Sequence, residues 1–152
     1  MTAARMTRPA DMTPQQLAEA SAAAMWDDDR ASRMLDMTLD SVAPGRAVLS
    51  MTITERMTNG HGNGHGGYIF TLADSAFAFA CNSYNAVTVG QQAAITYVAP
   101  VALGDRLTAT AIEQSRTGRS GVYDVTVTNQ DGRTVAHFRG LSRTVKGTHL
   151  PE

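Results

Sequence analysis

Two kinds of group that can act on a carbonyl occur within one short stretch, HGNGHGGYIFTLADSAFAFACN, which runs from His61 to Asn82. Gly66 and Gly67 open a long apolar segment that has the period of a helix. Free backbone N–H groups at a helix start, together with the helix dipole, stabilise a developing oxyanion, and glycine lets a ligand approach the backbone. The stretch therefore offers an oxyanion site at Gly66.

The second group is the carboxylate of Asp74, eight residues further along the same helix. Aspartate is a poor helix-interior residue, and a carboxylate in apolar surroundings must be paired, neutralised or used. No lysine or arginine stands three or four positions away. The alternative is a plain solvent-exposed or salt-bridged aspartate. A carboxylate in apolar surroundings has a raised pKa and is suited to act as a base or as a nucleophile.

The spacing of Gly66 and Asp74 keeps them apart within one chain. Eight residues at ~1.5 Å rise separate them by roughly 12 Å along the helix axis, which is too far for one carbonyl to contact both. Two such helices paired antiparallel about a two-fold axis would bring Gly66 of one copy opposite Asp74 of the other. The spacing therefore predicts a homodimer with two shared active sites.

The helix that carries these groups, from about 67 to 85, is apolar on nearly every side. Its main stripe consists of Ile69, Leu72, Ala73, Ala76, Phe77 and Ala80. Since a helix that is apolar all round is buried all round, we expect one side to pack on a sheet and the other on a second subunit.

Six segments with alternating apolar residues are candidate strands. Two of them, at about 34–40 and 47–54, are separated by Pro44-Gly45 and predict a hairpin. The others lie at about 87–98, 104–115, 119–129 and 133–146, with turn residues such as Asp131-Gly132 between them. We predict an α+β domain in which a curved six-stranded antiparallel sheet wraps around one long central helix.

A short N-terminal helix should precede the sheet. Thr13 is a typical N-cap and Pro14 a typical first helical residue, and the alanine-rich segment that follows has a modest apolar face. Residues 1–12 are polar and are predicted to be mobile, which leaves 13–148 as a single domain.

Composition narrows the possible partners and the compartment. A net charge of -1 without a basic block gives no sign of a nucleic-acid partner. No segment has the length and hydrophobicity of a membrane span or of a secretory signal, so no membrane partner is expected. The single cysteine, Cys81, excludes a disulfide framework and looks like a core residue. We expect a cytoplasmic protein.

The element order and the segment NGHGNGHGGYIFTLADSAFAFACNS resemble the hot-dog fold acyl-CoA thioesterases, and most closely the PaaI-type enzymes of bacterial phenylacetate catabolism. GVYDVTVTNQDGRTVAHFRG is also similar to PaaI-type sequences, and the resemblance extends from about Met34 to Lys146. It implies hydrolysis of an acyl-CoA thioester without a cofactor, by homotetramers that are dimers of dimers.

The resemblance also assigns roles to individual residues. Asp74 matches the catalytic carboxylate and Gly66 the backbone donor that polarises the thioester carbonyl. His65 and Asn59 match residues that help to place the thioester or the water, and Ser75 matches a Ser/Thr beside the carboxylate. The strand after the helix departs from the family: Gln91 and Gln92 stand where some relatives have a serine or threonine, and Ala99 stands where many have an arginine.

Further candidates for substrate binding follow from position and charge. Besides Gly67 and Gln92, they are Phe70, Phe77 and Tyr84, for an aromatic acyl pocket, and Arg116, Arg119, Arg143 and Lys146, for the CoA phosphates. Plain core packing for the aromatic residues, and plain surface charge for the basic ones, are the alternatives.

Other function classes have weaker support. The Gly62-x-Gly64-x-x-Gly67 spacing matches a dinucleotide fingerprint but lacks its parallel sheet, and His61 and His65 are too few for a metal site. No Gly-x-Ser-x-Gly occurs, which disfavours a serine hydrolase. A hot-dog hydratase or dehydratase, and a non-catalytic acyl-CoA-binding regulator, remain alternatives.

Overall fold

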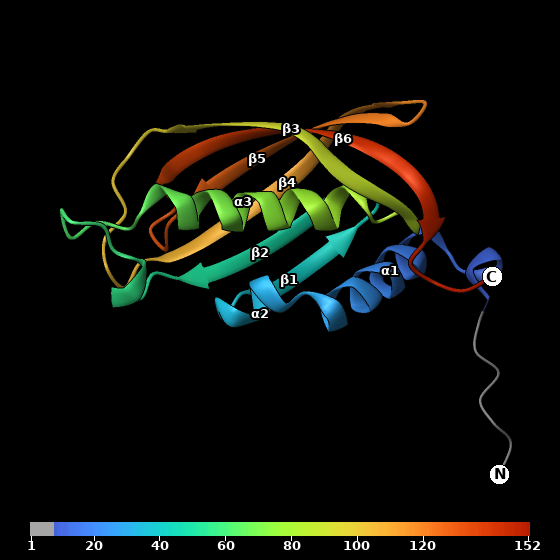
Figure 1. The fold of residues 1–152 in the computed structure, drawn as a ribbon, viewed down its shortest axis with the longest axis horizontal. Helices are drawn as coiled ribbons and strands as arrows, with labels where there is room; N and C mark the ends of the chain where they lie inside the picture. Colours follow the sequence, from blue (N-terminus) through green and yellow to red (C-terminus); the bar gives the residue numbers. More distant parts are fainter. Residues whose placement is uncertain (1–7) are drawn as a thin grey trace, which may run out of the picture.

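The computed structural model describes residues 8–152. Its centre is one six-stranded antiparallel sheet that curves around the long helix α3, Gly66–Cys81 (Figure 1). The strands are β1 Thr38–Ala43, β2 Arg46–Thr52, β3 Ala86–Tyr97, β4 Arg106–Thr117, β5 Ser120–Thr128 and β6 Thr134–Thr148. They lie in the order β1-β2-β4-β5-β6-β3. This architecture confirms the predicted hot-dog fold.

The N-terminal helix α1, Pro14–Asp28, is also confirmed. Thr13 and Gln16 form a reciprocal capping box in which each side chain accepts a hydrogen bond from the other residue's backbone N–H. Of the segment predicted to be mobile, Pro9–Asp11 forms a 3-10 helix, whereas residues 1–7 lie outside the described part of the chain. The mobility of that segment stays a prediction.

The first strand begins later than the sequence predicted. A second short helix, α2 Arg30–Met34, occupies the start of the segment that we expected to be extended. The Asp29 carboxylate caps this helix by accepting from the Ser32 N–H at 3.0 Å, and Asp36 then adopts a left-handed conformation with φ of 52°. The chain becomes extended only at Thr38.

Helix α3 ends four residues before the predicted Asn85. The side chain of Asn82 donates to the Ala78 carbonyl at 2.9 Å and accepts from the Thr88 N–H at 2.8 Å. These bonds satisfy backbone groups at the helix end and tie it to the start of β3, and Asn85 completes the turn with φ of 67°. The last helical turn is thus replaced by side-chain capping.

The concave face of the sheet buries the predicted stripe of α3. Ile69, Leu72, Ala73, Ala76, Phe77 and Ala80 are all buried. Phe77 contacts the rings of Tyr123 and Phe138 at centroid distances of 5.6 and 5.9 Å. Because the strands in this region come from distant parts of the chain, the helix acts as the core of the whole domain.

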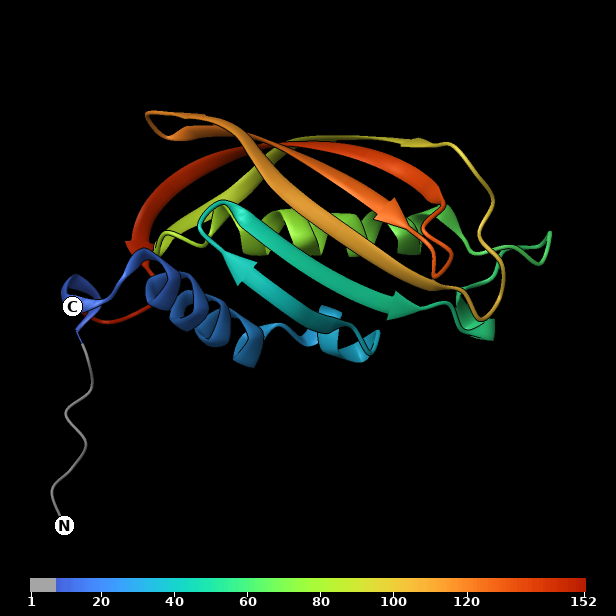
Figure 2. The same ribbon diagram turned by 180° about the vertical axis from the view of Figure 1, so that it is seen from behind.

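The N-terminal helices of the same chain lie along the β1 edge of the sheet (Figure 2), and two of their side chains reach α3. The Trp26 ring of α1 lies 5.8 Å from the Phe79 ring, and Ser32 of α2 shares a 3.0 Å hydrogen bond with Ser75. The expected second subunit on the side of α3 that faces away from the sheet stays a prediction. The sequence pattern did not reveal α2, the helix that delivers Ser32.

Candidate functional site

The loop before α3 is held in a fixed shape by Asn59. Its side-chain oxygen accepts from the N–H groups of His61 and Asn63, at 2.9 and 3.1 Å. The Gly64 N–H then donates to the Val101 carbonyl at 2.7 Å, and the His65 N–H to the Met57 carbonyl at 2.7 Å. Asn59 therefore shapes the loop that leads the chain into Gly66.

His65 is the N-cap of α3. Its Nδ1 atom accepts from the Gly67 N–H at 2.9 Å, which requires that Nδ1 carry no proton. Since the cap occupies the Gly67 N–H, this group is not free for a ligand. Within residues 8–152, the Gly66 N–H has no hydrogen-bond acceptor. The predicted oxyanion donor is thus the N–H that the fold leaves free.

The Gly66 hollow is an open cavity of about 550 Å³ that Gly66 helps to line. Asn59 and Gly66 contribute to its wall, together with Ile69 and the segment 97–101, which begins with the last residue of β3. Tyr97 was not predicted from the sequence. Its hydroxyl donates to the Gly66 carbonyl at 2.8 Å.

The Asp74 hollow is a separate cavity of about 300 Å³ between α3 and β3. It is lined by Asp74, Phe77 and Ala78 from the helix and by Gly90, Gln91, Gln92 and Ala93 from the strand. Gln92 therefore lies beside the carboxylate as predicted. The two hollows share no lining residue.

Asp74 is exposed as a residue in the single chain, and in residues 8–152 no cation lies within ion-pair distance of it. The part of the side chain that leans on the helix and β3 nevertheless loses water, and this desolvation raises the pKa of the Asp74 carboxyl above its ordinary value. In the single chain Asp74 is therefore solvent-exposed, as one of the two alternatives states, and it is not salt-bridged, as the other states.

Three candidate residues near Asp74 have clear structural contacts. Ser75 turns away from the Asp74 hollow and bonds Ser32. Phe70 is half-buried with its ring 5.4 Å from that of Phe138, and Phe77 is fully buried while also lining the hollow. Core packing therefore accounts for most of the Phe77 surface.

The structure does not bring Tyr84 to either hollow. Its hydroxyl donates to a Glu113 carboxylate oxygen at 2.9 Å, and the Arg116 guanidinium lies over its ring at 3.5 Å. Ten residues separate it from Asp74 along the chain, at the far end of α3. The same end of the sheet carries the remaining basic candidates Arg119, Arg143 and Lys146.

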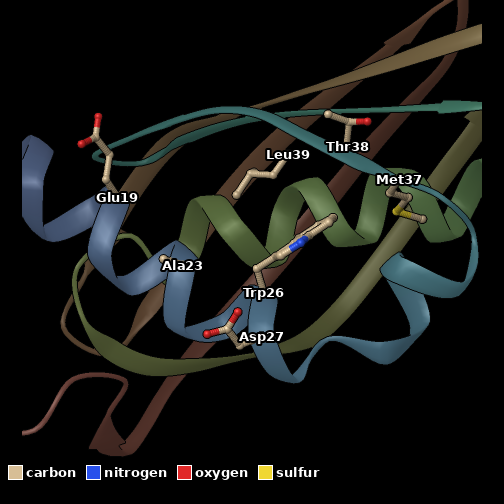
Figure 3. A pocket seen from close by; sticks show the side chains of 7 residues that line it. All are labelled: Glu19, Ala23, Trp26, Asp27, Met37, Thr38 and Leu39. Carbon is tan, nitrogen blue, oxygen red and sulfur yellow. The ribbon is translucent and has the colours of Figure 1, made fainter.

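A third cavity, of about 450 Å³, lies between α1 and β1 (Figure 3). Trp26, Met37 and Leu39 line it, with the carboxylates of Glu19 and Asp27 at its border. None of the predicted site residues contributes to it. In the described part of the chain, no group of three His, Cys, Asp or Glu side chains could hold a metal ion. No helix described there is long and apolar enough to cross a membrane.

A curved six-stranded antiparallel sheet wrapped around one long helix is the architecture of the hot-dog thioesterases. Residues 61–136 match the thioesterase superfamily, and the chain belongs to this family. It is a thioester hydrolase.

Acyl-coenzyme A thioesterase PaaI of Escherichia coli is 43% identical over 128 residues, which are 84% of this chain and 91% of that protein. Human acyl-coenzyme A thioesterase 13 is 35% identical over 68% of this chain and 76% of its own length. The structure of the E. coli PaaI protein, from the phenylacetic acid degradation operon, superposes with a TM-score of 0.88 at 41% identity and covers 90% of this chain and 99% of its own.

Tyr97 and Ser32 are the site contacts that sequence reasoning missed. Tyr97 stands 31 residues after Gly66, and Ser32 stands 43 residues before Ser75. Both contacts join segments that only the folded sheet brings together. The local signal for Tyr97 is its place just before the Pro100 turn that ends β3, where an exposed aromatic residue is unusual.

Proposed function

We propose that the protein hydrolyses acyl-CoA thioesters, with phenylacetyl-CoA and hydroxyphenylacetyl-CoA as the first candidate substrates. The observation that carries the proposal is the unoccupied Gly66 N–H at the start of α3, combined with a carboxylate of raised pKa on the same helix. The acyl-CoA thioesterases among the relatives support a CoA thioester as the substrate. The PaaI relative, from the phenylacetic acid degradation operon, supports an aromatic acyl group on it.

In the proposed reaction the Gly66 N–H donates to the thioester carbonyl oxygen and stabilises the negative charge that develops on it. The Asp74 carboxylate then acts in one of two ways. As a general base it takes a proton from water, whose oxygen attacks the carbonyl carbon. As a nucleophile it attacks that carbon itself and forms a mixed anhydride, which water then hydrolyses. On either route the C–S bond breaks and its electron pair leaves with the CoA sulfur. The sulfur becomes the thiol by taking a proton, from the Asp74 carboxyl on the first route and from water on the second.

The two groups would meet across a homodimer. Strand β3 is an edge of the sheet, and three of the exposed large apolar residues, Val89, Tyr97 and Val98, lie on it or directly after it. An exposed twelve-residue edge strand of this kind favours pairing with another strand. Both hollows border β3, one near Gln91 and the other at Tyr97.

Antiparallel pairing of two β3 strands about a two-fold axis near Ala94 would place Gln91 of one copy opposite Tyr97 of the other. The Gly66 hollow would then adjoin the Asp74 hollow of the partner. This pairing resolves the separation of about 12 Å along the helix, because each site would take its oxyanion donor and its carboxylate from different chains.

Substrate contacts follow from this pairing. Gln92 lines the Asp74 hollow, and Gly67 and Phe70 follow Gly66 at the start of α3. We assign these residues to contacts with the acyl group or the attacking water, without use of the Gly67 N–H, which His65 occupies. Arg116, Arg119, Arg143 and Lys146 are proposed for the CoA phosphates as a set at one end of the sheet, with Arg116 already stacked on Tyr84. Assembly of two dimers into a homotetramer is proposed from the family resemblance.

The test is release of free thiol from a panel of acyl-CoAs by the wild type and by Asp74→Asn. Fast release from phenylacetyl-type CoAs that is lost in the variant is the expected result. Release that is equal in the variant would overturn the role of Asp74. Hydration of an enoyl-CoA without thiol release would instead support a hydratase, and binding of acyl-CoA without turnover would support a regulator.

A further inference from the structure

One peptide group at the start of α3 is held at both of its ends by side chains. Its carbonyl oxygen, on Gly66, accepts from the Tyr97 hydroxyl at 2.8 Å. Its N–H, on Gly67, donates to His65 Nδ1 at 2.9 Å. The Gly66–Gly67 peptide is therefore clamped between a residue at the end of β3 and the helix N-cap.

A clamp matters here because two adjacent glycines make this turn the most freely rotating part of the helix. The free N–H of Gly66 belongs to the preceding peptide group and shares the Gly66 α-carbon with the clamped one. Rotation about the bonds of that α-carbon would change the direction in which the N–H points. Fixing the clamped peptide therefore restricts the direction of the proposed oxyanion donor.

The Tyr97 ring also limits what can stand at position 66. A β-carbon added to Gly66 would lie 2.9 Å from the ring carbon that bears the hydroxyl and 3.0 Å from the hydroxyl oxygen. The ring thus packs directly on the glycine, and its hydroxyl is brought to the carbonyl by that contact. Desolvation raises the pKa of the Tyr97 hydroxyl, which keeps it protonated and able to donate at neutral pH.

We propose that Tyr97 is a positioning residue of the thioesterase site, which acts through the Gly66–Gly67 peptide to aim the Gly66 N–H at the thioester carbonyl. The inference rests on the proposed function of Gly66 as oxyanion donor. Tyr97 does not contact the reacting atoms in this role. Its hydroxyl holds the carbonyl end of the peptide, whereas His65 holds the N–H end.

The test compares Tyr97→Phe, which keeps the ring and removes only the hydroxyl, with Tyr68→Phe. Tyr68 is a matched control because it lies on the first turn of the same helix and its hydroxyl makes no hydrogen bond within residues 8–152. For each full-length variant, kcat and KM are measured with the best acyl-CoA of the panel, together with Tm, oligomeric state, and hydrogen exchange of the Gly66 and Gly67 amides by NMR.

We expect Tyr97→Phe to lower kcat about tenfold with KM unchanged, since the lost bond affects the transition state more than substrate binding. The Gly67 amide should exchange faster, while Tm and assembly stay at the wild-type values. Tyr68→Phe should match the wild type in every measurement.

Unchanged kcat and unchanged Gly67 exchange in Tyr97→Phe would overturn the proposal. So would a fall in kcat that is accompanied by an equal fall of activity in Tyr68→Phe, because the effect would then be general to the first turn. If the wild type releases no thiol from any acyl-CoA, the proposed function fails, and the exchange of Gly67 still decides whether Tyr97 holds this peptide.

Discussion

Gly66 and Asp74 lie on the same helix, but they open into two hollows that share no lining residue. The Gly66 hollow is bordered by the end of β3 and the segment after it, and the Asp74 hollow by the middle of β3. A reaction that needs both groups at one carbonyl therefore needs two chains. This relationship leads to a prediction that distinguishes a shared site from a site within one chain.

Mixed dimers of Asp74→Asn and Gly66→Ala should regain activity that neither variant has alone. Gly66→Ala should be inactive because its β-carbon would meet the Tyr97 ring at 2.9 Å. In a mixed dimer, one site combines the intact Gly66 of one chain with the intact Asp74 of the other. After purification through both tags every dimer is mixed, so the preparation should have about half of the wild-type activity, since one of the two sites in each dimer is intact.

The measurement is thiol release by the two variants co-expressed with different tags and purified through both. Each variant purified alone is the control for residual activity. If both essential groups came from the same chain, every chain in the mixture would lack one of them, and co-expression would restore nothing.

The pH dependence of the reaction should reflect the raised pKa of Asp74. Both routes need the ionised carboxylate, so kcat/KM should fall as the pH falls through the pKa of Asp74 in the folded protein. That midpoint should lie above about 3.9, the ordinary value for aspartate. A rate profile that stays flat down to pH 4 in a protein that remains folded would contradict this assignment.

The same shift has a consequence for stability. Because the pKa is raised on folding, the folded state binds the proton more tightly, and stability falls as the pH rises from the unfolded pKa through the folded one. Asp74→Asn, which stays neutral, should be at least as stable as the wild type at pH 7, with assembly intact. Any advantage should disappear below about pH 3.9. Thermal unfolding followed by circular dichroism at both pH values measures it.

Much of the fold could be predicted because its signals are local. The alternation of apolar residues marked all six strands, and the Asp131-Gly132 turn was read from two residues, with Gly132 at φ of 77°. The boundaries of α3 and β1 were less accurate, because Asn82 and Asp29 act through side-chain hydrogen bonds that propensities do not describe.

The sequence predicted the residues proposed to take part in the reaction, but it did not predict the contacts that hold them in place. The sequence placed Gly66, His65 and Asp74 on one helix, and their relative positions follow from helix geometry alone. The contact of Tyr97 with Gly66 depends instead on how β3 runs back along α3 after the turn at the helix end. The 31 positions between these two residues correspond to no helix or strand period, so the contact cannot be read from the sequence pattern.

Gly140 of β6 should be essential for the packing behind Asp74. A β-carbon at Gly140 would lie 2.8 Å from three atoms of the Phe77 ring, which is fully buried and lines the Asp74 hollow. Gly140→Ala should therefore destabilise the protein by about 1–3 kcal/mol through overpacking, and should lower activity by displacing the ring. Urea unfolding and thiol release measure the two effects.

Gly60→Ala is the matched control, since a β-carbon at Gly60 meets nothing within 4 Å. It should change neither stability nor activity by much. Equal stability of Gly140→Ala and Gly60→Ala would contradict this prediction. It would mean that β6 can shift to accommodate the methyl group, and that the close approach of the Gly140 backbone does not fix the Phe77 ring.

The contact between Trp26 and Phe79 should hold the N-terminal helix α1 on α3. Phe79 is buried, and its ring lies 5.8 Å from that of Trp26. Phe79→Ala should destabilise the protein by about 3–5 kcal/mol and leave a cavity beneath α1. Trp26 is the single tryptophan of the chain, so its fluorescence reports on this contact directly and should shift to longer wavelength as water reaches the ring.

Met34→Ala serves as the comparison, because Met34 ends α2 close to the same helices and is 76% exposed. Its effect on stability should stay within about 0.5 kcal/mol, with unchanged tryptophan emission. Activity gives a further distinction, since neither α1 nor Trp26 borders the hollows at Gly66 and Asp74. Folded Phe79→Ala should therefore retain most of its thiol release, and a complete loss in the folded variant would mean that the N-terminal helices take part in the site.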